Sequence, residues 1–469
     1  MNFYFSWAEA RRFYEIGLPI FIAQMSQTGM NFADTAMTGQ YNAEDMAAVA
    51  VSGSVWAPIA LLGIGCLMAL PPLSAQMAGA GKRAEVAHLL RQGIWLTLII
   101  SAILMLFFWH ISWRLSDFGL EPAMADLAGS YLRALLWGLP GFMFFVNQRS
   151  FYEGFARTRP AMIIGLLGLA LNVPCNYVLI YGKLGLPALG ATGCGIASAV
   201  CYWFMGLAMM IYLQRDRQYK NLHPLFWPFH KRTLDGRPEP VFDRKLIWRA
   251  LRIGFPSAVA LFFEVSMFAL SAILLAPLGT VVVAGNQIAM NFGQIVFMIP
   301  LAIGMTVTIR VGYCLGAHKL GQARISAMTG MWLGVVFSLL IAALAIIFRE
   351  GIAHIYTSDA AVTALAMHLM YYLAAYQLLD ALQMTGIAVL RGYNDTRVIS
   401  LICFGAYWIV GLPLGYALAL TNFLGPPLGA VGFWISYLAA LGFGAACYWL
   451  RVRYLHSLSG RDIFARVSR

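Results

Sequence analysis

The sequence predicts an all-α polytopic membrane protein with twelve transmembrane helices in two six-helix lobes. Hydrophobic residues make up 60% of the 469 residues and charged residues only 11%, whereas a soluble protein carries about a quarter charged residues. Apolar runs such as 94–111 and 331–348 reach the roughly 18–20 residues that are needed to cross a bilayer. Short motifs also recur in order along the chain, which indicates a duplication.

Polar breaks divide the chain into the twelve expected spans. These are 14–38, 45–70, 92–112, 127–147, 160–181, 187–213, 250–276, 281–308, 326–348, 361–389, 398–420 and 428–450. The N-terminal residues lack the basic, apolar and small-residue pattern of a cleaved signal. We therefore expect the first span to be retained.

The basic residues are distributed in a way that predicts orientation. If both termini are cytoplasmic, only Arg114, Arg133, Lys183 and Arg349 of the 32 Lys and Arg residues fall outside. Such a bias is the positive-inside pattern. The net charge of +12 is then explained by topology, and no nucleic-acid partner is expected.

Three motif pairs indicate the duplication. "IGLP" at 16–19 returns as "IGFP" at 253–256, "GFARTR" at 154–159 as "GYNDTR" at 392–397, and "LGATG" at 189–193 as "LGAVG" at 428–432. Three matches in order, at offsets of 237, 238 and 239, favour two copies of one unit. Because six spans is an even number, both copies enter the membrane in the same direction, related by a pseudo-twofold along the membrane normal.

The duplication also predicts the domain boundaries. We expect an N-terminal lobe at 1–214, a basic cytoplasmic linker loop at 215–249, a C-terminal lobe at 250–452 and a cytoplasmic tail at 453–469. Prolines recur at matching depths of the two halves, as Pro19 with Pro256 and Pro174 with Pro413. They are candidate kinks, either for function or for packing alone.

Three acidic residues fall well inside predicted spans: Asp34, Glu264 and Asp380. An aspartate at a helix centre costs roughly 2.5–3.5 kcal/mol even on a generous scale. An intramembrane acid is therefore a functional candidate by default, although any one of the three could simply satisfy a neighbouring hydroxyl group. Asp34 lies toward the outer end of its span and could instead reach water.

Polar neighbours extend these acids into two clusters. Tyr376 lies four residues before Asp380 on the same helix face, so Glu264, Asp380 and Tyr376 form a candidate cluster in the second half. In the first half, Asn172 and Asn176 of "LNVPCN" have the same spacing and can accompany Asp34. Oxygen ligands suit a hard cation or a bound proton, so each cluster is a candidate site for one or the other.

The predicted spans contain no deep Lys or Arg. An anionic substrate, such as a lipid-linked pyrophosphate, needs cationic partners. An interior of carboxylates, hydroxyls, amides and rings favours cationic, partly apolar molecules instead. The seven cysteines form no CxxC pair and indicate neither a disulfide framework nor a metal site.

Several segments together resemble the multidrug and toxic compound extrusion (MATE) transporters, in the bacterial branch called NorM. They are "QTGMNFADTAMTG", "ALNVPCNYVLIYGKLGLPALGATGCG", "LFFEVSMFALSAILLAPLG", "AGNQIAMNF" and "LRGYNDTR". The resemblance runs the full length. It implies a two-lobed helical fold that expels cationic drugs and dyes in exchange for Na⁺ or H⁺.

The resemblance also implies roles for particular residues. The first-lobe acid of the family falls on Asp34, supported by Asn172 and Asn176, and the second-lobe cation site falls on Glu264, Asp380 and Tyr376. Gln287 matches a family polar position in the eighth span. We expect a monomer in the bacterial inner membrane, surrounded by lipid, with both termini cytoplasmic and no cofactor beyond a possible bound Na⁺.

Other classes of function are less well supported by the sequence. A lipid or polysaccharide-precursor flippase of related fold is the main alternative, and it predicts deep cationic side chains. An intramembrane enzyme predicts a HExxH, GxSxG or similar arrangement, and the sequence contains none, so we do not expect an enzyme. The sequence leaves open whether the coupling ion is Na⁺ or H⁺.

Overall fold

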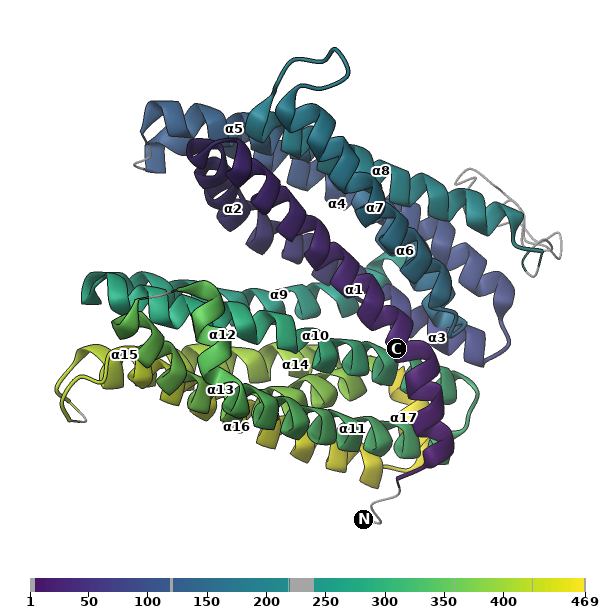
Figure 1. Ribbon diagram of the computed structural model, residues 1–469. Helices are drawn as coiled ribbons and strands as arrows, with labels where there is room; N and C mark the ends of the chain where they lie inside the picture. Colours follow the sequence, from purple (N-terminus) through teal and green to yellow (C-terminus); the bar gives the residue numbers. More distant parts are fainter. Residues whose placement is uncertain are drawn as a thin grey trace. The chain divides into compact units, whose positions relative to one another are not determined.

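The described part of the protein is built of helices alone. The computed structural model describes residues 5–118, 121–217, 219, 240–357, 359–423 and 425–467 (Figure 1). Its contacts divide the chain into two compact units. Unit 1 comprises Met1–Gly17 with Val259–Arg469, and unit 2 comprises Leu18–Ala258. Most of the linker loop expected at 215–249 lies outside the described residues.

Unit 2 contains most of the helices of the first half. They are α1 (Trp7–Tyr41, from Leu18 on), α2 (Ala43–Leu67), α3 (Leu70–Gly79), α4 (Arg83–Ser112), α5 (Pro122–Leu136), α6 (Leu139–Gly154), α7 (Arg159–Tyr181) and α8 (Gly190–Arg215). The first part of α9 (Arg244–Leu275), up to Ala258, also belongs to this unit. Proline at the start of α3, α5 and α6 suits a position whose N–H has no helical partner.

Unit 1 contains the helices of the second half together with the beginning of α1. Its other elements are the rest of α9, α10 (Thr280–Gly316), α11 (Leu320–Ile347), α12 (Arg349–Tyr356), α13 (Ala360–Gly392), α14 (Thr396–Cys403), a π-helical stretch η4 (Phe404–Gly411), α15 (Leu412–Leu420), α16 (Ala430–Ser457) and α17 (Gly460–Val467). In α13, 72% of the most apolar segment is buried, a larger share than in any other candidate span. This helix packs against α10, α11 and α16 and forms the centre of the unit.

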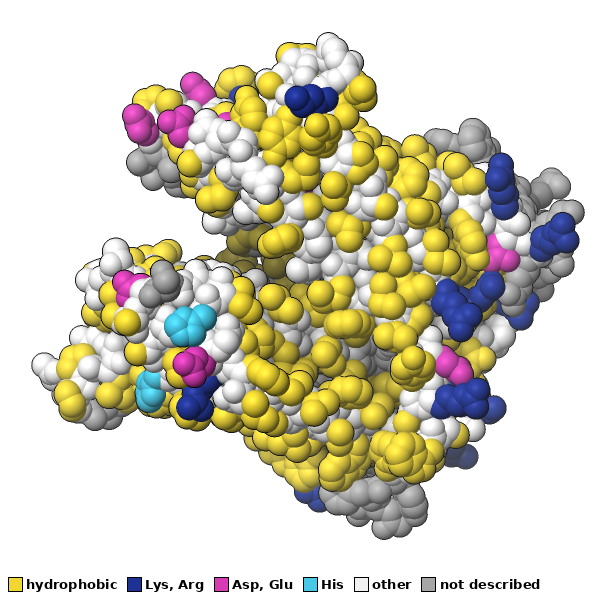
Figure 2. All heavy atoms as spheres, viewed as in Figure 1, with side chains coloured by type: hydrophobic (Ala, Val, Ile, Leu, Met, Phe, Trp, Pro, Cys, Tyr) yellow, Lys and Arg dark blue, Asp and Glu magenta, His cyan; other side chains and the backbone are white. Residues whose placement is uncertain are grey.

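The helices make the protein a multi-pass membrane protein. Ten helical segments within the described residues are long and apolar enough to cross a membrane. Helix α1 and the α5–α6 pair complete the twelve expected segments; the apolar run of α1 is interrupted by Gln24, Gln27 and Asn31. Figure 2 shows hydrophobic side chains over most of the visible helical surface, with Lys and Arg gathered mainly near one end of the helices. An apolar surface of this kind is suited to lipid.

The backbone repeats the duplication seen in the sequence. Left-handed residues occur at Ala156 and again at Asn394, a separation of 238 residues. In both turns the N–H of the following residue donates a hydrogen bond to a carbonyl of the preceding helix. Arg157 donates to Tyr152 and Asp395 donates to Leu390, each at 2.9 Å. A non-glycine residue in this conformation costs roughly 1–2 kcal/mol. Its retention at matching positions shows that the two halves share the same closing turn.

The four prolines predicted as kinks lie in two different helical settings. Pro19, Pro174 and Pro256 lie inside helices that continue through them. Pro413 instead is the second residue of α15, just after η4, where the helix widens. Because proline has no N–H and clashes with the preceding turn, a π-helical stretch is one way in which a helix accommodates it.

Candidate functional site

Asp34 lies at the centre of a buried polar cluster in unit 2. Asn172 and Asn176 of α7 each donate a side-chain hydrogen bond to its Oδ1, at 3.0 and 2.6 Å. Ser198 of α8 donates to its Oδ2 at 2.6 Å. Asp34, the two asparagines and Ser198 are all buried, so Asp34 does not lie at an open helix end. The structure brings together the three residues that the sequence grouped, and it adds Ser198.

Local helix geometry explains this convergence. Asn172 and Asn176 are one turn apart on α7, so their amides lie one above the other, and Asn176 also donates to Oδ1 of Asn172 at 3.2 Å. No cation lies within ion-pair distance of Asp34 among the described residues. The charge of an ionised Asp34 is therefore balanced only by neutral donors.

Asp380 lies in the interior of unit 1, on the central helix α13. Its side chain is buried, and its Oδ2 has no hydrogen-bond partner within the described residues. Two further buried oxygens on the same helix, Oε1 of Gln377 and Oε1 of Gln383, also lack such partners. Buried polar atoms are nearly always satisfied in native proteins. Oxygens of this kind fit the donor set that a hard cation such as Na⁺ prefers.

Glu264 approaches Asp380 from α9. The two carboxylates are close enough to interact electrostatically, and Tyr376 interacts with both. The Tyr376 ring packs edge-on against Phe268 of α9 and Trp434 of α16, with centroids 6.4 and 5.9 Å apart. The second predicted cluster is thus assembled from α9 and α13, with aromatic rings beside it.

Tyr407 is a member of this site that the sequence did not single out. Its hydroxyl group interacts electrostatically with Glu264 and accepts a short hydrogen bond from the Gln383 amide. Tyr407 lies in the π-helical stretch η4. Helices with this local widening often carry functional residues, and here the widened turn directs a buried phenol toward the Glu264 carboxylate.

Gln287 is not part of this cluster in the structure. It lies on an exposed face of α10, where its amide donates to Asn291 at 3.0 Å. The preceding residue, Asn286, faces the interior and accepts a hydrogen bond from Trp434 at 2.9 Å. A ligand role for Gln287 is therefore a prediction that rests on the resemblance alone.

Two arginines, Arg149 and Arg391, interact with acidic side chains of the helices. Arg149 of α6 pairs with the buried Glu153 at 3.1 Å and reaches Gln24 at 3.4 Å. The sequence placed Arg391 with the charges that set orientation, yet in the structure it interacts electrostatically with Glu264. This interaction of the partly exposed Arg391 was not predicted from the sequence. The described residues contain no group of three or more His, Cys, Asp or Glu side chains that could hold a metal ion.

Ten candidate spans within the described residues, a duplicated architecture and a buried acid in each unit are typical of a membrane transporter. A family model for MatE matches residues 19–178 and again residues 256–417. The chain therefore belongs to the MatE family, whose members are transporters and not enzymes. The same model matches once in each half, in agreement with the duplication.

Solved structures show the same fold. The eukaryotic MATE transporter AtDTX14 superimposes with a TM-score of 0.85 at 20% identity, over 98% of each chain. A MATE protein in complex with MaD3S gives 0.82 at 19% identity, over 98% of this chain and 97% of that chain. A MOP superfamily transporter from Pyrococcus furiosus gives 0.81 at 19% identity with the same coverage, and the reverse polarity of its binding pocket suggests a different function for it.

Proposed function

We propose that the protein is a cation-coupled efflux antiporter, which exports cationic, partly apolar drugs and dyes by alternating access in exchange for Na⁺ or H⁺. One observation carries the proposal: each unit encloses a carboxylate with no ion-pair partner in the described residues. Asp34 is bound only by amides and a hydroxyl, and Oδ2 of Asp380 has no partner. A charge in such surroundings must be neutralised by a cation or a proton.

The same carboxylates can serve both cargoes in turn. A cationic drug neutralises Glu264 and Asp380 when it enters from the cytoplasm, while Phe268, Tyr376 and Trp434 offer ring faces for its apolar part. Na⁺ or H⁺ entering from outside neutralises them instead, and the drug loses its attraction. Transport follows if the two facing states differ in affinity for each cargo.

Charge limits the coupling. One charge crossing about 100 mV is worth about 2.3 kcal/mol. A one-for-one exchange of monovalent cations gains nothing from this potential and must rely on the concentration gradient of the ion. To use the membrane potential, the transporter must admit more ion charges than drug charges leave.

A flippase for a lipid or polysaccharide precursor is the second candidate, because a relative of the same fold has a pocket of reverse polarity. The arginines of this chain argue against it. Arg149 is paired with Glu153, and Arg310 is paired with Glu9. These guanidinium groups are already bound and would not be available to an anionic headgroup. Arg391 interacts electrostatically with Glu264, which favours that carboxylate over an anionic headgroup.

The remaining expectations follow from this proposal. Both termini lie in the cytoplasm, since the basic residues favour that side. The chain is a NorM-type monomer of the bacterial inner membrane, surrounded by lipid. Bound Na⁺, if Na⁺ is the coupling ion, would use the oxygens of Glu264, Asp380 and Tyr376.

The test is ethidium efflux from proteoliposomes under a Na⁺ gradient and a pH gradient, imposed separately. We expect one of the two gradients to drive efflux by the wild type, and Asp380→Asn to lose it. The matched control is Glu350→Gln, an exposed acid of α12, which should keep wild-type efflux. If Asp380→Asn pumps as well as the wild type under both gradients, the buried carboxylate is structural and the proposal fails.

A further inference from the structure

The first helix of each half is shared between the two units. Helix α1 belongs to unit 1 up to Gly17 and to unit 2 from Leu18 on (Figure 1). Helix α9 belongs to unit 2 up to Ala258 and to unit 1 from Val259 on. Each unit therefore holds the beginning of the helix whose remainder lies in the other unit.

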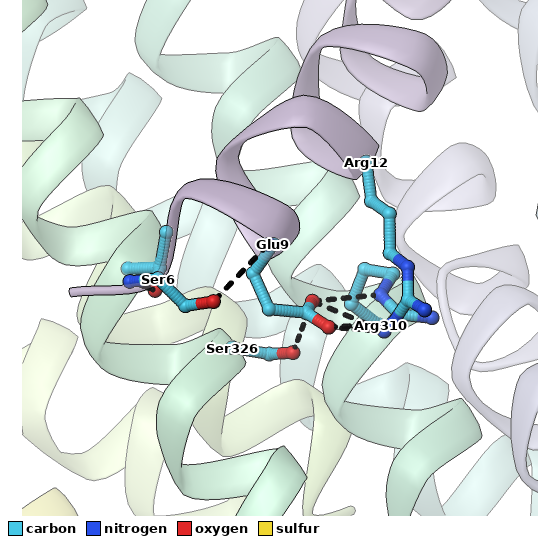
Figure 3. Close-up of polar contacts among 6 residues, drawn as sticks. Ser6, Glu9, Arg12, Arg310 and Ser326 are labelled. Carbon is cyan, nitrogen blue, oxygen red and sulfur yellow. Dashed lines mark hydrogen bonds and ion pairs between the residues drawn. The ribbon is translucent and has the colours of Figure 1, made fainter. Parts of the chain in front are cut away.

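A buried ion pair fixes the beginning of α1 within unit 1. Glu9 accepts hydrogen bonds from Arg310 of α10, with Nη2 at 2.8 and 3.0 Å and Nε at 3.2 Å. Ser326 of α11 donates to the same carboxylate at 2.8 Å, and Arg12 donates at 2.7 Å. Figure 3 shows Glu9 lying between these groups. Glu9, Arg310 and Ser326 are all buried, so this contact is shielded from solvent and salt.

An acidic residue also lies at the start of α9, but its side-chain partner is a histidine instead of an arginine and a serine. Asp243, just before α9, accepts backbone hydrogen bonds from Lys245 and Leu246 and lies 3.3 Å from Nε2 of His88 on α4. His88 and Ser326 are 238 residues apart, which is the separation of the duplicated closing turns. The same position of the duplicated helix therefore contacts the acid at the start of the shared helix in both units. The two acids are not matching positions, since the offset of 237 pairs Glu9 with Leu246, so what recurs is an acid at the start of the shared helix held by the corresponding neighbouring helix.

The two contacts are not equally strong. The side chains of Asp243 and His88 are 26% and 13% exposed to solvent, whereas those of Glu9 and Arg310 are each 8% exposed. Breaking a buried pair leaves an uncompensated charge and costs far more than breaking an exposed pair. The Glu9 contact is consequently the one least able to open during a transport cycle.

We propose that Glu9 is a positioning residue of the transport cycle, which holds the beginning of α1 on α10 and α11 while Asp34, on the same helix, exchanges its cation in unit 2. A single helix is then bound through one acid in each unit. When cation exchange at Asp34 moves the rest of α1, this movement is transmitted to unit 1, because the beginning of α1 stays bound to α10 and α11. This inference rests on the proposed antiport function and assigns no ligand to Glu9 itself.

The first test measures the attachment without transport. In the purified full chain, amide hydrogen exchange of residues 7–17 should rise about tenfold or more in Glu9→Gln, because local opening controls exchange. Asp34→Asn should leave those amides as protected as in the wild type. The control is Glu15→Gln, whose exposed pair with Arg11 holds nothing in place. Unchanged protection in Glu9→Gln would overturn the proposal, whether or not the protein transports ethidium.

The second test asks whether attachment is what transport needs. Ethidium efflux should slow about tenfold or more in Glu9→Gln, with ethidium binding close to that of the wild type and a lower thermal unfolding temperature, because Arg310 stays buried without its carboxylate partner. The backbone N–H of Ser6 donates to Thr329 at 3.3 Å, so a Ser6→Cys, Thr329→Cys pair can be joined by a short bis-maleimide in a chain whose native cysteines are replaced. We expect this covalent link to leave efflux intact with Glu9 present and to restore it in Glu9→Gln.

The outcomes separate the two proposals. If the wild type moves no ethidium under either gradient, the antiport function fails and the exchange measurement alone decides the role of Glu9. If the wild type transports and the link blocks efflux, the contact must open during the cycle and the positioning role is wrong. If the link forms but does not restore efflux in Glu9→Gln, Glu9 acts by some means other than holding α1.

Discussion

Asn176 and Asp34 are 142 residues apart in the chain and are joined by a hydrogen bond of 2.6 Å. The asparagine directs its donor at the carboxylate, while its own Oδ1 has no hydrogen-bond partner within the described residues. Asn176 thus stabilises the acid with one end of its amide and keeps an acceptor for another group. A cation bound to Asp34 would find this oxygen close by.

A double-mutant cycle measures this contact. Asn176→Ala and Asp34→Ala should each destabilise the protein, with a coupling energy of about 1.5–3 kcal/mol, because hydrogen bonds to charged groups fall in that range. The measurement is chemical or thermal unfolding in one detergent at constant pH. As a control, Asn291→Ala on the exposed face of α10, combined with Asp34→Ala, should show no coupling. Additive effects for Asp34 and Asn176 would mean that the bond contributes little.

Tyr407 gives a prediction for the second site. Tyr407→Phe removes the hydroxyl group that accepts a hydrogen bond from Gln383 and that interacts electrostatically with Glu264. An unsatisfied buried donor costs about 1–3 kcal/mol, so stability should fall and efflux should slow. Tyr416→Phe, an exposed tyrosine in the adjacent α15, is the matched control. Equal efflux in both variants would show that the hydroxyl group is dispensable.

The attachment of α9 to unit 2 can be tested through Gly254. A Cβ atom at this position would lie 2.0 Å from the backbone carbonyl of Cys66, so Gly254→Ala must displace one of the two helices. We expect a loss of about 1–3 kcal/mol, which is typical of overpacking. In α2, Gly53→Ala meets no atom within 4 Å, and it should be neutral or stabilising, because alanine is favoured over glycine in helices by up to about 1 kcal/mol.

The Glu9 contact also predicts a pH dependence. Burial raises the pKa of Glu9, but hydrogen bonds from Arg310 and Ser326 and the charge of Arg310 outweigh it, so the pKa lies below its ordinary value. A lowered folded-state pKa contributes stability above the unfolded value of about 4.3 and loses it as the pH falls through the folded value. Protection of residues 7–17 should therefore be constant from about pH 8 to pH 5. A loss of protection already between pH 7 and pH 6 would contradict this pairing.

Much of the architecture is predictable because bilayer thickness and duplication constrain the sequence strongly. The length of the apolar runs predicts spanning helices, and the recurring "GFARTR" and "GYNDTR" segments mark turns that the structure indeed repeats at Ala156 and Asn394. Helical spacing predicts that Asn172 and Asn176 share a face. The structure places both on Asp34, although their role in transport is still a prediction.

The rest depends on contacts between distant helices, which periodicity does not encode. Ser198 and Tyr407 belong to residue types that are common in membrane helices, and nothing near them in sequence distinguishes them. Tyr407 also reaches Glu264 from a π-helical stretch, which shifts the helical register ahead of Pro413. Arg310 was counted among the charges that set orientation, and only the fold shows that it binds Glu9.

The shared helices have a consequence for biosynthesis. Glu9 leaves the ribosome long before its partners Arg310 and Ser326, which are translated about three hundred residues later. Unit 2 in turn is complete only when residue 258 has been made, just after the second half begins. Domains generally fold as units in the order of their synthesis, but here neither half of the gene encodes a complete unit. Two fragments divided within residues 220–239 should consequently accumulate only when they are expressed together.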